Sequence, residues 1–306
     1  MDTVEILLAT YNGEKYIREQ LDSIINQDYD NWIVRACDDA STDGTYEILM
    51  EYRDRYPSKF KVARNIKGTG SAKLNFLNLI KDSTCEYVMC CDQDDVWLPN
   101  KISLSLKKMM EAEKDNIPVL VHTDLKVVDQ NLKVLSESFF KYSNLNSKLE
   151  YKDLLIQNSV TGCTIMMNRP LVSLVAKEND CQNILMHDWL ISLLAAGTGK
   201  IVFIDCPTML YRQHSVNSVG AKQYGVSLFV SKLINSDLRK SLVDTTLQAG
   251  QIAQTYRKEL GEELYQLTDR YSRLFTLSKF QRVGFYIKYR VLKKGLSRKI
   301  CQLFLG

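Results

Sequence analysis

The sequence predicts an α/β protein with a mixed, mostly parallel β-sheet flanked by helices, followed by a helical C-terminal extension. Over the first 125 residues, short apolar segments alternate with segments of helical spacing, which is typical of a doubly wound sheet. Three of the apolar segments end in acidic or polar clusters, and ligands of such sheets bind at the carboxyl ends of the strands. The sequence therefore predicts one binding site at one edge of the sheet.

Five strands are predicted in this first part of the chain: Val4–Ala9, Trp32–Cys37, Phe60–Arg64, Tyr87–Cys91 and Val119–His122. The helices between them are expected after the Thr10–Gly13 turn as far as Gln27, over Tyr46–Tyr56, over Ala72–Lys81 and after Pro99. Apolar residues spaced three apart support the third of these helices. The fourth strand is entirely apolar, which indicates burial on both faces.

The second half of the chain is less regular. Strands are expected over Cys163–Asn168 and Lys200–Ile204, and a helix over Leu185–Ala196. From about Gly225 the pattern is helical to the end. We therefore expect an α/β domain over residues 1–220 and a helical region over residues 221–306.

The composition excludes several classes of protein. Of the 306 residues, 45% are apolar and 25% charged, which is ordinary for a globular protein, and no apolar run approaches the ~18 residues of a membrane span. Because the chain enters its first strand at once, we expect no targeting segment. The eight cysteines form no CxxC pair and lie mostly in apolar runs, so we expect reduced core thiols in a cytoplasmic protein.

The acidic cluster Asp92-Gln93-Asp94-Asp95 directly follows the buried fourth strand. Two carboxylates spaced i, i+2 can face a divalent cation and a diphosphate, because Mg²⁺ and Mn²⁺ prefer oxygen ligands and bridge carboxylates to phosphates. The alternative is a solvated acidic turn. The apolar strand before the cluster and Val96-Trp97 after it favour an anchored loop.

A second acidic pair, Asp38-Asp39, ends the second strand in the same way. We expect Asp39 to accept hydrogen bonds from a nucleoside base or ribose hydroxyl. The residues that follow, Ser41, Thr42 and Asp43, are suited to cap the next helix.

Together these segments resemble a known family. Ala9-Thr10-Tyr11-Asn12-Gly13, then Asp38 to Thr45, then Asp92 to Trp97 resemble, in order and spacing, the inverting family-two glycosyltransferases of the Rossmann-like GT-A fold. The resemblance covers at least residues 4–220 and implies a nucleotide-sugar-binding catalytic domain that uses Mg²⁺ or Mn²⁺. It implies donor contacts from Thr10, Tyr11, Asn12, Asp39, Asp92 and Arg212, and metal ligation by Asp94 and His214.

A later motif, His187-Asp188-Trp189, resembles the acidic element that supplies the general base in this family. The resemblance implies that Asp188 removes the proton from the acceptor hydroxyl, which is a poor nucleophile until a base does so. The alternative is an acid that stabilises a helix N-terminus. The acceptor is expected against Gly162, Cys163, His187 and Trp189, and His122-Thr123-Asp124 is a further candidate.

The motif variants most resemble rhamnosyltransferases that use dTDP-L-rhamnose, and the expected acceptor is a bacterial polysaccharide or lipid-linked glycan. A UDP-hexose transferase of the same fold is one alternative, and a non-catalytic nucleotide-sugar-binding or assembly module is another. A nucleotidyltransferase would show a Gly-rich basic phosphate loop where this chain has Thr10-Tyr11-Asn12-Gly13.

The charge is concentrated in the tail. Residues 279–306 hold eight Lys or Arg and no acid, whereas the rest of the chain carries a formal charge of about −4. Apolar residues alternate with these cations, as in basic amphipathic helices that lie on anionic membranes. We therefore expect peripheral contact with the inner face of the cell membrane. A subunit contact in a homo-oligomer is the alternative, and no nucleic-acid-binding motif is present.

Overall fold

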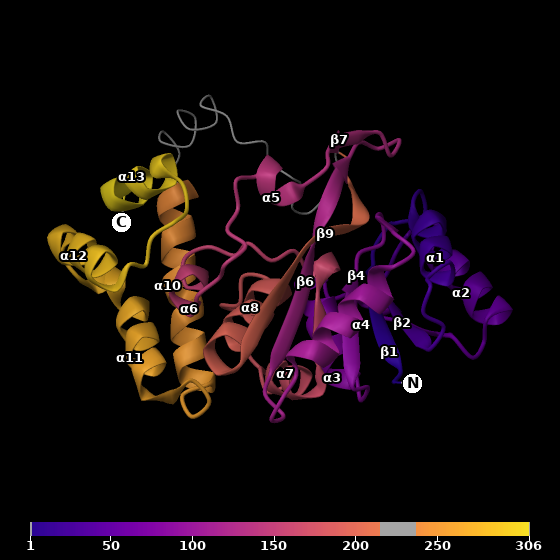
Figure 1. The fold of residues 1–306 in the computed structure, drawn as a ribbon, viewed down its shortest axis with the longest axis horizontal. Helices are drawn as coiled ribbons and strands as arrows, with labels where there is room; N and C mark the ends of the chain where they lie inside the picture. The colour runs from indigo at the N-terminus through magenta and orange to yellow at the C-terminus, as the bar shows by residue number, and fades with distance from the viewer. Residues whose placement is uncertain (1, 215–236, 306) are drawn as a thin grey trace.

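A mixed β-sheet crosses the centre of the molecule, and the computed structural model describes residues 2–214 and 237–305 of the chain (Figure 1). Its strands follow the order β3-β2-β1-β4-β8-β6-β9-β5, with β7 paired to β6. They are β1 Val4–Thr10, β2 Trp32–Asp38, β3 Phe60–Arg64, β4 Tyr87–Cys91, β5 Val96–Trp97, β6 Val119–Val128, β7 Val134–Ser136, β8 Met166–Asn168 and β9 Lys200–Arg212.

The sheet is parallel in its N-terminal half and mixed beyond it. Strand β1 pairs in parallel with β2 and β4, and β2 pairs in parallel with β3. Strand β8 then lies antiparallel between β4 and β6, while β6 and β9 are parallel. The mixed α/β fold expected from the sequence is confirmed.

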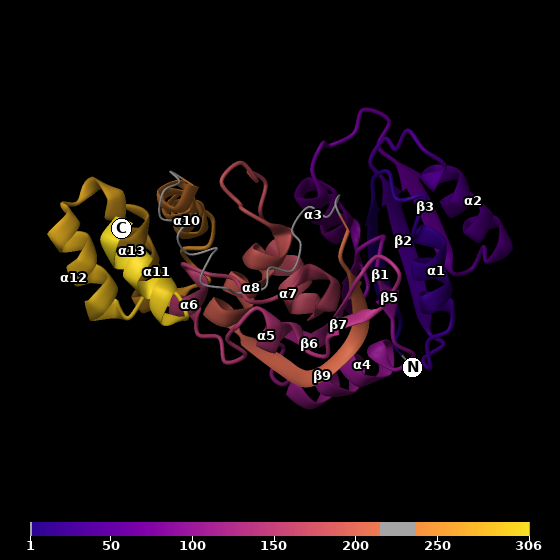
Figure 2. The same ribbon diagram turned by 90° about the horizontal axis from the view of Figure 1, so that it is seen from above.

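Helices cover both faces of the sheet, as the view from above shows (Figure 2). They are α1 Ile17–Ile25, α2 Thr45–Arg55, α3 Ala72–Asp82, α4 Lys101–Ala112, α5 Phe139–Tyr142, α6 Tyr151–Leu154, α7 Arg169–Val175, α8 His187–Thr198, α10 Asp237–Thr255, α11 Gly261–Ser272, α12 Lys279–Tyr289 and α13 Leu296–Leu305. Single 3₁₀ turns occur at Gly162–Thr164 and Leu274–Thr276.

Two hydrophobic clusters lie on opposite faces of the sheet, and successive residues of one strand serve different clusters. In β1, Ile6 and Leu8 belong to the cluster under α1, α2 and α4, whereas Leu7 belongs to the cluster under α3, α7 and α8. Side chains alternate across a strand, so a strand covered on both faces is apolar throughout. This explains the uninterrupted apolar runs of the sequence.

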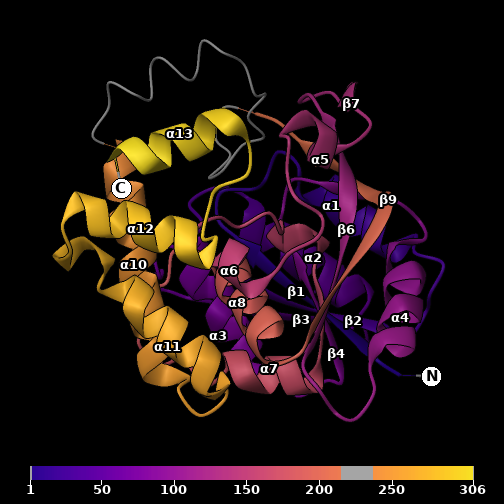
Figure 3. The same cartoon turned by 60° about the vertical axis from the view of Figure 1, so that its left-hand side comes forward.

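The C-terminal helices α10 to α13 gather at one end of the molecule (Figures 1 and 3). They pack against the hydrophobic cluster that lies under α3, α7 and α8. Tyr256, Tyr271 and Tyr286 are buried in this cluster. The helical pattern expected for this region is present from Asp237 onward. The boundary expected near residue 220 lies outside the described residues.

Most predicted elements agree with the structure within a few residues, and the differences have a common cause. The strand expected at Val119–His122 continues to Val128, and the one expected at Lys200–Ile204 continues to Arg212. These two strands pair with each other along their whole length, with register shifts, and this pairing holds polar residues in extended backbone. Of the expected Cys163–Asn168 strand, only Met166–Asn168 pairs with neighbouring strands, because Gly162–Thr164 forms a 3₁₀ turn.

All eight cysteines are free thiols, and five of them are buried. Cys206 is exposed, which differs from the core position expected for it. None of the described helices is both long enough and apolar enough to cross a bilayer.

One glycine is required where α8 passes into β9. A Cβ atom at Gly199 would lie 1.9 Å from the carbonyl oxygen of Pro118, which also accepts a hydrogen bond from the Lys200 N–H at 2.9 Å. Both neighbours are backbone, so neither moves freely. We expect Gly199→Ala to lower the free energy of unfolding by about 1–3 kcal/mol, the usual cost of overpacking, in urea titrations.

Gly284→Ala is the matched control, because nothing lies within 4 Å of a Cβ atom at this position inside α12. Alanine favours the helix over glycine by roughly 0.5–1 kcal/mol, so this variant should be slightly more stable than the wild type. Equal effects of the two substitutions would contradict the proposed collision at Gly199.

Candidate active site

The predicted ligand-binding edge is formed where β1, β2 and β4 end side by side. Thr10 is in register with Asp38, and Leu8 is in register with Cys91, the last residue before the acidic loop. The turn after Thr10, the Asp38-Asp39 pair and the loop Asp92–Asp95 therefore leave the sheet at one edge. The sequence-predicted donor site is brought together here.

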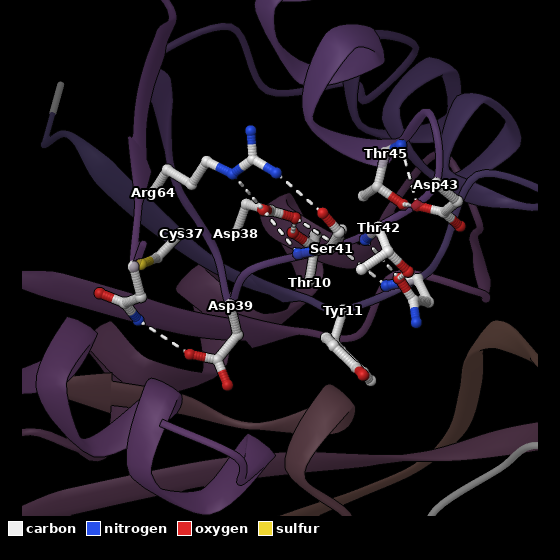
Figure 4. Close-up of polar contacts among 12 residues, drawn as sticks. Thr10, Tyr11, Cys37, Asp38, Asp39, Ser41, Thr42, Asp43, Thr45 and Arg64 are labelled. Atoms are coloured by element: carbon white, nitrogen blue, oxygen red, sulfur yellow. Dashed lines mark hydrogen bonds and ion pairs between the residues drawn. The ribbon is translucent and has the colours of Figure 1, made fainter. Parts of the chain in front are cut away.

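The two aspartates that end β2 have different environments (Figure 4). Asp38 is fully buried and accepts hydrogen bonds from the Ser41 backbone at 3.0 Å and the Thr10 hydroxyl at 3.3 Å, and it lies 3.3 Å from the Arg64 guanidinium. It therefore holds the turn together. Asp39 points away from this group, toward the side on which the Tyr11 ring lies.

Asp39 accepts four hydrogen bonds from the segment after β3. Its Oδ1 accepts from the Asn65 amide at 3.0 Å and the Thr69 N–H at 2.7 Å, and its Oδ2 accepts from the Thr69 hydroxyl at 2.8 Å and the Gly70 N–H at 3.1 Å. Burial alone would raise the pKa of Asp39, but these donors outweigh it and hold the pKa below its ordinary value. A nucleoside that binds Asp39 must share or replace one of these bonds. Sequence reasoning missed this segment, although Lys67-Gly68-Thr69-Gly70 has the composition of a tight loop.

The turn after β1 is stabilised by its own side chains. Asn12 has a positive φ of 48°, its N–H donates to the Ser41 hydroxyl at 2.9 Å, and its side-chain oxygen accepts from the Thr42 N–H at 2.9 Å. The side chain of Asn12 is thus engaged within the protein. The neighbouring Tyr11 ring is 57% exposed and is free to contact a ligand.

Gln93, inside the acidic loop, connects this loop to the turn. Its side-chain oxygen accepts from the Tyr11 N–H at 2.8 Å and its amide nitrogen donates to the Tyr11 carbonyl at 2.9 Å. The two bonds imitate a strand pairing. A Cβ atom at Gly13 would lie 2.4 Å from the Gln93 oxygen, so the close approach depends on glycine at that position. The sequence analysis assigned no role to Gln93.

The acidic loop offers two sets of candidate metal ligands. Asp94 Oδ2 lies 2.7 Å from His214 Nε2, and both side chains are partly exposed. Deeper in the protein, Asp92, Asp95 and Cys163 offer ligand atoms within 4.8 Å of one another. Burial raises the pKa of the Cys163 thiol well above its ordinary value, and sulfur is a softer ligand than the oxygens that Mg²⁺ and Mn²⁺ prefer.

Lys101, at the start of α4, lies buried beneath these acids and was not anticipated. Its amine contacts the Thr208 hydroxyl at 3.4 Å and the Trp97 ring at 4.8 Å. Burial lowers the pKa of Lys101 to about 8, and attraction to Asp95 and Asp92 opposes that shift. A buried cation next to buried carboxylates reduces their mutual repulsion.

Asp188 lies in the first turn of α8, close to the acidic loop. Burial raises its pKa to about 7, although hydrogen bonds from the Trp189 and Gly162 backbone and the Asn158 side chain oppose this shift. Asp188 in turn contributes to the raised pKa of Asp92, about 7, after burial and Asp94. The expected catalytic carboxylate and the expected metal-binding loop therefore share one electrostatic environment.

Three of the residues expected to contact the glycan acceptor, Gly162, His187 and Trp189, lie around the start of α8. His187 is buried and stacks on Phe76 with ring centroids 4.2 Å apart. Neither ring nitrogen of His187 has a hydrogen-bond partner among the described residues, and burial lowers the pKa of the ring to about 3. The Trp189 indole N–H donates to the Leu154 carbonyl at 2.5 Å, and Gly162 lies against the His187 ring.

Asp124, the weaker acceptor candidate on β6, caps a helix instead. Its carboxylate accepts hydrogen bonds from the Ser138 hydroxyl and from the backbone of Phe139 and Phe140, at the start of α5. His122 is fully buried beside Phe203, with ring centroids 5.0 Å apart. Both residues lie inside the extended β6, whereas the sequence analysis placed them at its end.

Gly162 allows α8 to begin where it does. A Cβ atom at Gly162 would lie 2.7 Å from His187 Nε2, and the buried ring cannot move without losing its stack on Phe76. We expect Gly162→Ala to lower the free energy of unfolding by about 1–3 kcal/mol in denaturant titrations. The double variant Gly162→Ala/His187→Ala should lose less stability than the sum of the losses of the two single variants, because it removes the ring with which the new methyl group would collide. Strictly additive effects would contradict this collision.

Comparisons with known proteins identify the family of this chain. The model of the family described as "Glycosyl transferase family 2" matches residues 5–173. The chain is 34% identical over 226 residues to the dTDP-rhamnosyl transferase RfbG of Shigella flexneri, a match that covers 70% of this chain and 74% of that protein.

Solved structures show the same fold. The chain is similar to S. aureus TarS 1-349 in complex with UDP, with a TM-score of 0.58, 20% identity and coverage of 94% of this chain and 75% of that one. It is also similar to the mannosyltransferase PcManGT from Pyrobaculum calidifontis in complex with GDP-Man and Mn²⁺, with a TM-score of 0.53, 13% identity and coverage of 98% and 87%. Because the family model matches more than half of its length, this chain belongs to glycosyl transferase family 2.

Proposed function

We propose that the protein transfers L-rhamnose from dTDP-L-rhamnose to a hydroxyl of a bacterial polysaccharide or lipid-linked glycan, with inversion at the anomeric carbon. The observation that carries the transferase proposal is the position of Asp188 within electrostatic reach of Asp92. The rhamnose assignment is supported by the 34% identity to a dTDP-rhamnosyl transferase. A UDP-sugar is the competing donor, since the structurally similar TarS was solved with UDP.

The donor is proposed to bind across the edge formed by β1, β2 and β4. The exposed Tyr11 ring offers a stacking surface for the base, and Asp39 offers acceptor oxygens on the same side (Figure 4). Thr10, Asn12 and Asp92 complete the proposed donor site. The hydrogen bonds around Thr10 and Asn12 make their contribution one of holding the turn in shape.

The residues of the acidic loop fit a Mg²⁺ or Mn²⁺ ion. The carboxylate of Asp94 and the imidazole of His214 are suitable ligands, and their 2.7 Å contact places the two ligand atoms next to each other. When bound, such an ion would offset the negative charge that develops on the departing diphosphate. We propose Asp94 and His214 as its protein ligands.

Asp188 is the proposed general base. Its carboxylate takes the proton of the acceptor hydroxyl while the acceptor oxygen bonds to the anomeric carbon. The bond from that carbon to the diphosphate oxygen breaks, and the electron pair leaves with the diphosphate. The pKa of Asp188, about 7, suits this role because a base works best near the ambient pH. Gly162, Cys163, His187 and Trp189, around the start of α8, are proposed to shape the acceptor side.

We expect Asp188→Asn to lower kcat with dTDP-L-rhamnose by about 10²–10⁴-fold and to leave dTDP affinity, measured by calorimetry with Mn²⁺, within about twofold. In the wild type, kcat/KM should rise with pH and level off above about pH 7, as the base loses its proton. A variant with full turnover would refute the base. Binding of UDP in place of dTDP would reassign the donor, and binding of neither would refute the transferase proposal.

The same carboxylate has a predicted effect on stability. The pKa of Asp188 is raised in the folded protein, so the folded state holds this proton more tightly than the unfolded chain. The stability that this proton contributes is fully present below about pH 4 and is lost as the pH rises through about 7. Asparagine carries no titrating proton, so Asp188→Asn does not lose stability in this way. The variant should therefore melt at a higher temperature than the wild type at pH 8, and the difference should shrink toward pH 5.

We further propose that α12 and α13 rest on an anionic membrane surface. Leu296, Ile300 and Phe304 are exposed and follow one another at four-residue spacing on one side of α13. The Lys279 amine lies 4.6 Å from the Phe304 ring centroid, which brings the start of α12, with its 90% exposed Phe280, beside the end of α13 (Figure 3). The cations of this acid-free segment are worth on the order of 1 kcal/mol each against anionic lipid.

Vesicle sedimentation tests this surface. The full chain should bind vesicles of phosphatidylglycerol and phosphatidylcholine, and the double variant Phe280→Ser/Phe304→Ser should bind them at least tenfold more weakly. Ile66→Ser is the control, because Ile66 is 87% exposed but lies outside the C-terminal helices. Equal binding by both variants would contradict the surface, and loss of a dimer by the double variant in sedimentation velocity would assign it to a subunit contact.

A further inference from the structure

The end of β9 carries a buried arginine that contacts the metal loop from behind. Arg212 is 2% exposed, and each of its guanidinium nitrogens donates a hydrogen bond within the protein. Nε donates to the Asp94 carbonyl at 2.8 Å, and Nη1 donates to the Gln130 carbonyl at 2.7 Å. Nη2 donates to the Glu19 carboxylate at 2.6 Å. Arg212 thus joins the metal loop to α1 and to the turn after β6.

The backbone beside Arg212 secures the same loop. The Arg212 N–H donates to Asp95 Oδ1 at 3.1 Å, and the His214 ring, two residues later, meets the Asp94 carboxylate at 2.7 Å. Asp94 is therefore held at its carbonyl by one side chain and at its carboxylate by another. Both holding groups come from a single short segment of chain.

Tyr16 is the platform on which these two side chains lie. The Arg212 guanidinium carbon is 4.4 Å from the centroid of the Tyr16 ring, and the His214 ring centroid is 5.0 Å from it. Tyr16 is itself buried at the start of α1. An aromatic face attracts a guanidinium group and fixes its plane, so the ring determines where both side chains point.

We propose that Arg212 and Tyr16 are positioning residues that set the divalent-cation affinity of Asp94 and His214. The inference rests on the proposed metal-dependent transfer. It gives Arg212 a different role from the direct donor contact that the sequence resemblance implies. Groups that orient metal ligands typically change metal affinity by 10- to 100-fold when they are removed. Lysine cannot replace Arg212, because the three N–H donors of an ammonium diverge from one nitrogen, whereas the acceptors around Arg212 are placed for three separate nitrogens of a planar guanidinium.

Two affinities distinguish a residue that positions the metal ligands from one that contacts the donor: the affinity for Mn²⁺ and the affinity for dTDP. Free Mn²⁺ is titrated against the full chain by electron paramagnetic resonance without nucleotide, and dTDP is titrated by calorimetry in EDTA. Arg212→Lys and Tyr16→Leu should each weaken Mn²⁺ binding by 10- to 100-fold and leave the dTDP affinity in EDTA within about twofold. Tyr16→Phe keeps the aromatic face and should restore Mn²⁺ affinity to near the wild-type value.

Opposite results overturn the proposal. If Arg212→Lys keeps its Mn²⁺ affinity but loses dTDP affinity in EDTA, Arg212 contacts the phosphate. If Arg212→Lys does not fold, the comparison of Tyr16→Leu with Tyr16→Phe tests the proposal on its own. Equal Mn²⁺ affinity of these two variants would show that the aromatic ring of Tyr16 does not position the metal ligands. Failure of the proposed function has a different signature, because the wild type would then bind neither dTDP nor UDP.

Discussion

Repulsion among carboxylates at one edge of the sheet is the constraint that the site must satisfy. Asp92, Asp94 and Asp95 are consecutive or nearly so, and Asp188 adds a fourth acid from the start of α8. Burial and this crowding raise the pKa of Asp92 to about 7 and raise that of Asp95 as well. Charges so close in a low-dielectric surrounding are costly unless cations or hydrogen-bond donors offset them.

The chain places two buried cations near this cluster. Lys101 lies within electrostatic reach of Asp92 and Asp95, and the Arg212 guanidinium donates a hydrogen bond to the Asp94 carbonyl. Each cation is in turn positioned by an aromatic ring, Trp97 for the lysine and Tyr16 for the arginine. The long pairing of β6 with β9 carries Arg212 to this point, since β9 reaches the acidic loop only in its last residues. The extended strand thus serves the site as well as the sheet.

Much of the fold was predictable because its signals are local. The strands β1 to β4 are short apolar runs whose ends coincide with turn or acidic residues, and their limits agree with the structure within one residue. The extensions of β6 and β9 were not predictable. Residues such as Asp124 and Arg212 have low strand preference, and they are extended because each strand supplies the other's hydrogen bonds.

The positions of the site residues were more predictable than their roles. The sequence placed Thr10, Asp39 and Asp94 at one edge of the sheet, and the structure brings them there. It could not distinguish side chains that face a ligand from those that complete the loops. Tight turns at a sheet edge leave backbone N–H groups without ladder partners, and those groups must find acceptors nearby. Asp38 and Asn12 serve that need.

Asp39 both holds a loop and is proposed to bind a base, because its carboxylate accepts several hydrogen bonds at once. A carboxylate has room for about four hydrogen bonds, and the segment Asn65–Gly70 supplies four. A base N–H that reaches Asp39 would therefore share an oxygen with one of these protein donors or take its place, so the carboxylate keeps its full set of hydrogen bonds. The donor site is thus kept in shape without ligand by bonds of the kind that the ligand would make. Such an arrangement favours selectivity for a base with an N–H at that position, since a base with an acceptor there would place its lone pair against the carboxylate oxygens and gain no hydrogen bond.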